Sequence, residues 1–201
     1  MEWPTKPRAG STQTKWCGRH RCNSTIKTLR ALGATITDVQ LPSLGHLNAL
    51  ASVITSYEAA QLHRESMSLQ PEHYPAAVRR RLLTAVLIDD DTYHLARGLR
   101  GKLLQQVLNN VFNDVDVIVC PTLRHSAKDV SAIAEDDLAV SGQIGLEHLR
   151  LNRPFSYLGL PALSIPAGAD ENRIPIGQQL IAAPGKDMVL IRLARALYEN
   201  A

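Results

Sequence analysis

The residue types that could form a hydrolytic site are present in this sequence, but their spacing is unfavourable. A serine nucleophile needs a base beside its hydroxyl group and donors that stabilise the oxyanion. No Gly-x-Ser-x-Gly stretch occurs, and none of the six lysines lies in an apolar, strand-like segment. His125, Ser126 and Asp129 have the residue types of a triad, but such short-range clusters rarely reach the required geometry. We therefore predict no catalytic residue in this chain.

Cys17, His20 and Cys22 form a second group of candidate residues, because all three are metal-ligand types and lie within six positions. Structural zinc needs four ligands at spacings such as Cys-x-x-Cys, and no second pair follows here. We expect no metal and no cofactor. Cys120 ends an apolar stretch and is expected to be a core thiol. A total of three cysteines argues against a disulfide framework and indicates a reducing compartment, so we expect a cytoplasmic protein.

The net charge of +3 is unevenly distributed along the chain. Residues 1–30 contain seven Lys or Arg and one acid, which gives +6, and the remainder contains fifteen basic and eighteen acidic groups, which gives −3. Such a basic arm can bind nucleic acid. Only Trp3 and Trp16 could stack on bases there, so we do not expect a nucleic-acid partner. We interpret residues 1–24, which lack periodicity, as a disordered basic arm.

Hydrophobic periodicity in the rest of the chain predicts both helices and strands. Helices are expected at residues 24–32, 46–66, 76–87, 92–112 and 187–199, and strands at 35–39, 115–120, 162–165 and 176–181. Thr92 is the expected N-cap of its helix, and residues 124–145 are expected to form a polar loop. No apolar run approaches the roughly 18 residues of a membrane span, and residues 1–10 lack the apolar core of a secretory signal. We expect an α/β protein without a membrane partner.

Four motifs follow one another along the chain. They are the pair Glu58-Ala59, the helix pattern Tyr93-x-x-Ala96-x-x-x-Arg100, the strand that ends at Pro121-Thr122, and the Gly/Pro-rich run from Gly159 to Leu180. In this order they resemble the C-terminal part of the amidase signature family, and the resemblance extends over residues 29–199. Within the last motif, Gly159 allows backbone angles closed to other residues, and Pro161 and Pro166 are expected to set the ends of a strand.

The resemblance implies a substrate-binding role for Arg100. In glutamine-using members an arginine at this position lies in the substrate pocket, and a guanidinium suits a substrate carboxylate. A structural ion pair with an acidic residue is the alternative role. Those members also carry an acid where this chain has Leu149, so glutamine is not the expected substrate. Two further departures are Ser156, in place of the usual asparagine, and Gln178, in place of a leucine on an apolar strand face.

The resemblance as a whole implies that residues 25–201 are the C-terminal portion of an amidase domain, with a partial amidase-signature fold in which helices cover a mixed sheet. The family hydrolyses carbon–nitrogen amide bonds with a Ser–Ser–Lys triad. Those residues lie upstream of the matched motifs, so the chain is expected to be inactive alone and to take a small-molecule amide only when an N-terminal half completes it. The alternative is a non-catalytic interaction module that pairs its open strand edge with another amidase chain, as a homo- or hetero-oligomer.

Overall fold

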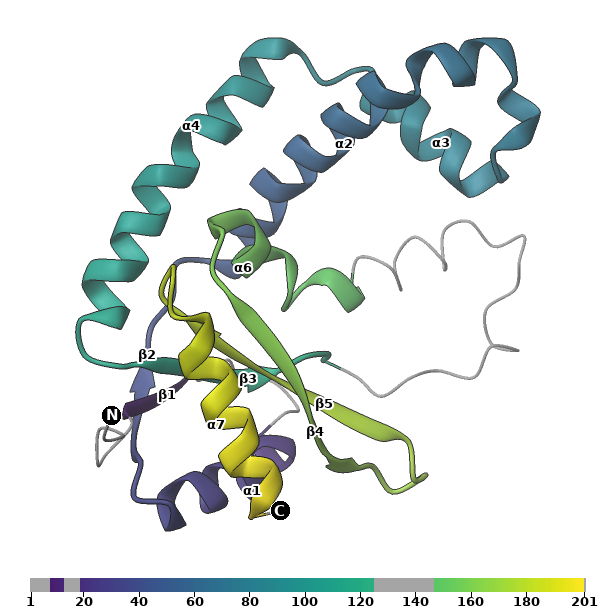
Figure 1. The fold of residues 1–201 in the computed structure, drawn as a ribbon. Helices are drawn as coiled ribbons and strands as arrows, with labels where there is room; N and C mark the ends of the chain where they lie inside the picture. Colours follow the sequence, from purple (N-terminus) through teal and green to yellow (C-terminus); the bar gives the residue numbers. More distant parts are fainter. Residues whose placement is uncertain (1–7, 13–18, 125–146, 201) are drawn as a thin grey trace.

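One mixed sheet of five strands organises the protein (Figure 1). The computed structural model describes residues 8–12, 19–124 and 147–200. The strands are β1 (Arg8–Thr12), β2 (Thr35–Val39), β3 (Val117–Pro121), β4 (Ala162–Ala169) and β5 (Pro175–Ala182), in the spatial order β2-β1-β3-β5-β4. The first three are parallel to one another, and β5 is antiparallel to both β3 and β4. The expected α/β fold with a mixed sheet is confirmed.

The position of β1 differs from the sequence prediction. A disordered arm is predicted for residues 1–24, but residues 8–12 form a strand in the middle of the sheet, and α1 (Arg19–Ala31) begins before residue 24. Ala9 lies opposite both Ile36 of β2 and Val117 of β3. The sequence of this short strand shows no apolar alternation that would predict it. The strand is held instead by backbone pairing with a neighbouring strand on each side. The rest of the expected arm lies outside the described residues, and the division of the chain into an arm and residues 25–201 stays a prediction.

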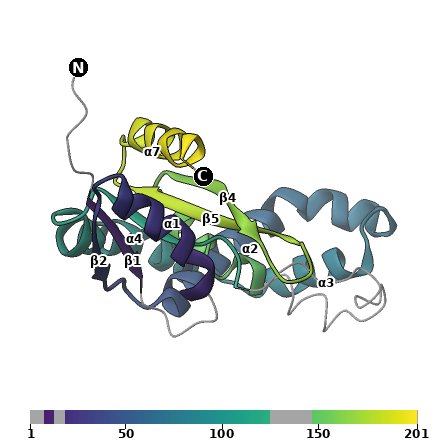
Figure 2. The same ribbon diagram turned by 90° about the horizontal axis from the view of Figure 1, so that it is seen from below.

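Helices cover both faces of the sheet (Figure 2). One face packs against α1 and α7 (Asp187–Glu199), whose buried residues join those of β3 and β5 in one core cluster. The other face packs against α2 (Leu44–Leu69), α4 (Asp90–Val107) and α6 (Arg153–Leu158). A 3₁₀ turn at Pro71–His73 leads from α2 to α3 (Ala76–Ala85), which packs on α2 beyond the edge of the sheet, and a π-helical turn at Leu108–Phe112 ends α4.

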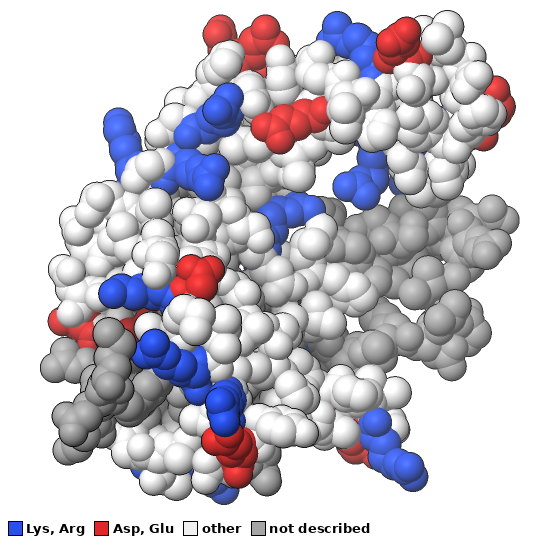
Figure 3. Space-filling view, viewed as in Figure 1, with Lys and Arg blue, Asp and Glu red and all other residues white. Residues whose placement is uncertain are grey.

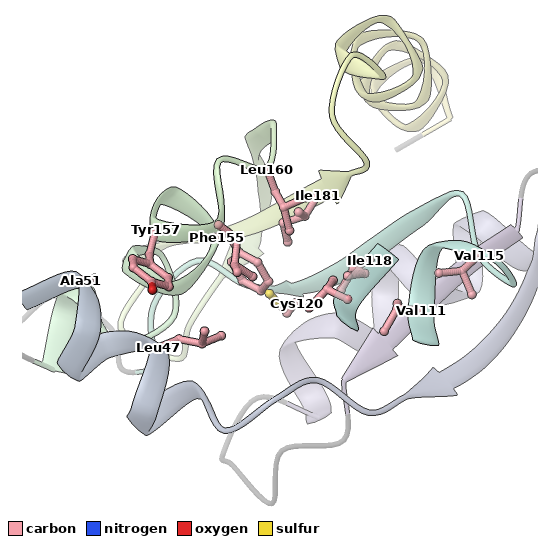
Figure 4. Close-up of a cluster of buried hydrophobic side chains, with 12 residues drawn as sticks. Leu47, Ala51, Val111, Val115, Ile118, Cys120, Phe155, Tyr157, Leu160 and Ile181 are labelled. Carbon is pink, nitrogen blue, oxygen red and sulfur yellow. The ribbon is translucent and has the colours of Figure 1, made fainter. Parts of the chain in front are cut away.

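The buried strands β3 and β5 divide their side chains between two cores. Val117 and Val119 face the α1/α7 cluster, whereas Ile118 and Cys120 face the cluster below α2, α4 and α6 (Figure 4). This division follows from the period of two in a strand, in which successive side chains point to opposite faces. Cys120 is 4% exposed, as expected for a core thiol. Phe155 of α6, which is 2% exposed, belongs to this second cluster, so the short helix is packed against the sheet by its own core residue.

Most element boundaries match the sequence prediction, and the exceptions have local causes. The closing helix is observed at the predicted residues 187–199. The N-cap of α4 is Asp89 and not Thr92, because the Asp89 carboxylate accepts a hydrogen bond from the Thr92 backbone N–H at 2.6 Å. Pro166 does not end β4, which continues to Ala169, because an edge strand tolerates a residue that cannot donate. The predicted loop at 124–145 lies outside the described residues except for Arg124.

Within the described part of the chain, no helix has the length and apolar character needed to cross a membrane.

Candidate functional site

The Arg100 side chain lies across the turn that joins α6 to β4. The guanidinium approaches Gly159 so closely that a Cβ atom at this glycine would lie 2.6 Å from Arg100 Nη2. Gly159 caps the C-terminus of α6 with a left-handed φ of 72°. The left-handed backbone conformation favours glycine at this position, whereas the Arg100 contact involves the end of a flexible side chain that can move.

Tyr157 fixes α6 against α4 next to this contact. Its hydroxyl donates a hydrogen bond of 2.6 Å to the backbone carbonyl of Ala96, one helical turn before Arg100. The ring is buried, and burial raises the pKa of the phenol, while the positive charge of Arg100 acts in the opposite direction. The same turn of α4 therefore accepts the hydrogen bond that anchors α6 and carries Arg100, whose guanidinium reaches the C-terminal end of α6.

No acidic residue pairs with Arg100 in the described part of the chain. The ion pairs there join Arg124 and Arg150 to Glu147, at 2.7 and 2.6 Å, and Arg195 to Glu199 at 2.8 Å. Arg100 belongs to none of them. Its donors are therefore available to a group from outside these residues, and a guanidinium fork matches a carboxylate.

Two stacked tyrosines join α2 to α4 on the N-terminal side of Arg100. The rings of Tyr57 and Tyr93 are 4.2 Å apart and inclined by 16°. Tyr93 donates to a Glu58 carboxylate oxygen at 2.9 Å, and Tyr57 donates to Asp90 at 2.7 Å. The bond to Asp90 raises the pKa of Tyr57, because it favours the protonated phenol. These two hydrogen bonds fix the relative position of the helices, so the first two sequence motifs both contribute to the contact between α2 and α4.

The third and fourth motifs also meet, at the end of β3. Thr122 Oγ1 lies 3.0 Å from Ser164 Oγ, and the pair passes over Gly177, where a Cβ would lie 3.0 Å from the threonine oxygen. Beside them, the Gln179 amide donates to the carbonyl of Leu151 at 2.8 Å. The four motifs, which are separated in sequence, are therefore brought together in pairs.

Gln178 is a polar residue on an apolar strand face, as its sequence position predicts. Its side chain is 1% exposed on the α1/α7 face of β5, where Leu180 and Ala182, two and four residues further on, are apolar. Neither the amide nitrogen nor the amide oxygen has a hydrogen-bond partner among the described residues. A buried amide without partners is costly, so we expect this glutamine to be less favourable for folding than an apolar residue of similar size.

A further arginine of α6 was not identified from the sequence. Arg153 donates from Nη1 to Ser52 Oγ of α2 at 2.5 Å. Burial lowers the pKa of this arginine, and the nearby charge of Arg81 lowers it further. The only sequence signal is its place directly before Pro154, five residues ahead of the Gly/Pro-rich run that begins at Gly159.

The remaining candidate residues that the structure describes do not form a second site. Ser156 and Leu149 are exposed, and Ser156 makes only a long 3.5 Å contact to the Asn152 carbonyl. No lysine hydrogen-bonds to a serine among the described residues, and no cluster of metal-ligand side chains is found in them. The His125, Ser126 and Asp129 triad and the Cys17 to Cys22 group lie outside the residues whose side chains are described.

A cavity of about 530 Å³ lies between α1, β4 and α7, on the face of the sheet opposite Arg100. Its walls are mostly apolar and include Ile165, Ala194 and Leu197, with Thr25 as a buried polar contributor. Arg195, a charged residue of its lining, is already paired with Glu199 at 2.8 Å, so Arg100, and not this cavity, marks the candidate site.

Comparisons with known proteins agree with this arrangement. The family model described as Amidase matches residues 18–191. A glutamyl-tRNA(Gln) amidotransferase chain of Deinococcus deserti is 32% identical over 87% of this chain and 40% of its own length, and a fatty acid amide hydrolase of Arabidopsis thaliana is 35% identical over 54% of this chain and 18% of its own. A crystal structure of an amidase superposes with a TM-score of 0.83 at 24% identity, over 99% of this chain and 46% of that one. The chain thus spans about 40% of the length of the first of these curated relatives.

Proposed function

Because this chain belongs to the amidase family, we propose that it forms the substrate-binding portion of an enzyme that hydrolyses carbon–nitrogen amide bonds. Arg100 would hold a carboxylate of the substrate, and the Ser–Ser–Lys triad would come from a part of the enzyme that this chain does not contain. The observation that carries the proposal is the Arg100 guanidinium, which lies against Gly159 without an acidic partner among the described residues.

The geometry suits binding better than catalysis. The Tyr157 hydrogen bond to Ala96 and the tyrosine stack fix the helix that carries Arg100, and the Arg100 side chain is exposed and accessible to a carboxylate. An arginine stays charged at every physiological pH and cannot act as the base of a hydrolase. Its contribution to the reaction would be orientation of the amide toward a nucleophile on another part of the enzyme.

The absence of activity in the isolated chain is part of the proposal. A serine-directed fluorophosphonate should not label the 201-residue chain alone, because no described serine is paired with a base. Labelling of the isolated chain, lost when one of its serines is replaced, would overturn the proposal.

Completion of the site gives the second test. The chain would be mixed with the N-terminal portion of the Deinococcus deserti relative, and hydrolysis of malonamate would be compared with that of propionamide. Arg100→Gln should raise KM for the charged malonamate by about 10- to 100-fold and leave the neutral amide unaffected, since one charge-assisted contact is lost. Lys102→Gln, an exposed charge on the same helix, is the matched control. Equal losses for both amides would contradict a role of Arg100 in carboxylate binding.

A non-catalytic interaction module is the second candidate function. The observation in its favour is β4, which pairs only with β5 and leaves its other edge open among the described residues. An open edge can accept a strand from another amidase chain or partner. Stable co-elution with an N-terminal amidase portion, without any hydrolysis by the complex, would favour the module over the enzyme.

A further inference from the structure

The cavity between α1, β4 and α7 has the size and lining of a small-molecule pocket. Its volume of about 530 Å³ lies within the range of roughly 300–1,000 Å³ that is usual for such pockets. Strand β4 contributes Ile165 and Ala167 to the wall, and α7 contributes Ala194 and Leu197. These side chains favour a compact ligand with an apolar body.

The charges at the rim of this cavity are already compensated. Arg195, the charged residue among those that line it, pairs with Glu199 at 2.8 Å, one turn further along α7. Both of these side chains are largely exposed to solvent, and Figure 3 shows charged side chains of both signs on the outer surface of α7. We therefore expect an uncharged ligand.

The buried amide of Gln178 lies beside the same cavity. Gln178 of β5 is paired in register with Ile165 of β4, so the two side chains are neighbours on the α1/α7 face of the sheet. Ile165 lines the cavity, whereas Gln178 lies directly behind this lining and is only 1% exposed. Neither polar atom of its amide has a hydrogen-bond partner among the described residues.

The hydrogen-bonding groups of this amide determine which ligand would suit it. A glutamine amide offers an acceptor oxygen and two donor hydrogens. A carboxamide presents the same groups, so two carboxamides can join through a pair of hydrogen bonds, whereas a ketone or an ether satisfies only the donors. Binding of a carboxamide would thus remove the cost of a buried amide without partners.

We propose that the cavity binds a small, uncharged molecule with an apolar body and a carboxamide, which Gln178 recognises. Ile165 separates the amide from the cavity, and it is a partly buried residue of the edge strand β4, so its side chain has room to turn and admit the carboxamide. The site goes beyond the proposed hydrolysis. It lies on the face of the sheet opposite Arg100, and binding there requires neither Arg100 nor the triad.

The test is a titration of the full 201-residue chain with benzamide and, separately, with toluene, which has the same ring without the amide. Binding would be followed by NMR through the methyl signals of Ile165 and Leu197, which line the cavity. Gln178→Leu should weaken benzamide binding at least about tenfold, the effect of two lost hydrogen bonds, and should leave toluene binding equal or tighter. Gln178→Met provides the same comparison if leucine does not fit, and circular dichroism establishes that each variant is folded.

A second pair of variants shows whether the ligand occupies the cavity. Ala194→Phe fills the space and should weaken binding of both compounds at least about tenfold, whereas Ile191→Phe, at an exposed position of α7 outside the lining, should have no effect. The proposal is wrong if benzamide does not bind, if Ala194→Phe leaves its binding unchanged, or if Gln178→Leu affects benzamide and toluene equally. Failure of malonamate hydrolysis would affect only the proposed function, since no measurement here depends on turnover.

Discussion

Replacement of Gln178 by leucine tests whether an unpartnered amide in the core limits the stability of this protein. The side chain is 1% exposed, and both of its polar atoms lack hydrogen bonds among the described residues. Burial of an amide in that state costs about 1–3 kcal/mol in protein mutational data. Leucine is similar in size and apolar, but its branched shape can cost up to about 1.5 kcal/mol in repacking. We therefore expect the free energy of unfolding to rise by about 1–2 kcal/mol.

Urea denaturation of the isolated chain, followed by circular dichroism, measures this change. The midpoint concentration should increase while the m-value stays constant, and the melting temperature should rise by about 2–4 °C for each kcal/mol in a chain of this size. Gln178→Met, which keeps an unbranched side chain, provides the same test if leucine does not fit. Either substitution removes the amide without opening a cavity.

The neighbouring glutamine supplies a matched control of opposite sign. Gln179 is 3% exposed, but its amide donates to the carbonyls of Leu151 at 2.8 Å and of Pro121 at 3.2 Å. Gln179→Leu should lower the free energy of unfolding by about 1–3 kcal/mol, because buried carbonyls lose their donor. If the two leucine variants shift the midpoint in the same direction, or if Gln178→Leu is the less stable protein, the Gln178 amide has a partner and the reasoning is wrong.

Three further substitutions test the geometry around α4 and α6. Gly159→Ala should destabilise the protein by about 1–3 kcal/mol, because a side chain is strained at φ 72°, and thermal melting would detect it; an unchanged melting temperature would contradict the strain. Tyr157→Phe should cost about 1 kcal/mol through loss of the hydrogen bond to Ala96, measured by urea denaturation against Tyr198→Phe, an exposed control. The Asp89 cap lowers the pKa of its carboxyl below the usual 3.8, so its stabilisation is present above pH 3.8 and disappears as the pH falls through the lower folded-state value; Asp89→Ala should remove that part of the acid dependence, and identical acid unfolding curves would refute the assignment.

The sequence predicted the elements with strong internal patterns. The bounds of the closing helix are predicted correctly because Leu190, Leu193 and Leu197 repeat at helical spacing and face one core cluster. Short elements were harder to predict. The six residues of α6, directly before the Gly/Pro-rich run, make less than two turns, which is too short for a periodic signal, and β1 has no apolar alternation. Both are determined by their neighbours in the fold.

The candidate site was predicted only in part for a related reason. The resemblance drew attention to Arg100, and its contact with Gly159 connects two of the recognised motifs. The contact between Arg153 and Ser52 joins residues 101 positions apart, and no local pattern indicates such a pair. The unpaired amide of Gln178 was anticipated as an unusual residue on a strand face, but its lack of partners required the packed sheet.

The central position of β1 has a consequence for how the chain folds. Ala9 must pair with Val117, which is 108 positions later, before β2 can be joined to the rest of the sheet. At a synthesis rate of about 5–20 residues per second, β1 and β2 wait roughly 5–20 s for the strand that completes them. During that time one side of β1 offers unsatisfied backbone groups to any extended segment nearby. Aggregation of the newly made chain should therefore depend more on the speed of translation between residues 12 and 117 than on the stability of the finished fold.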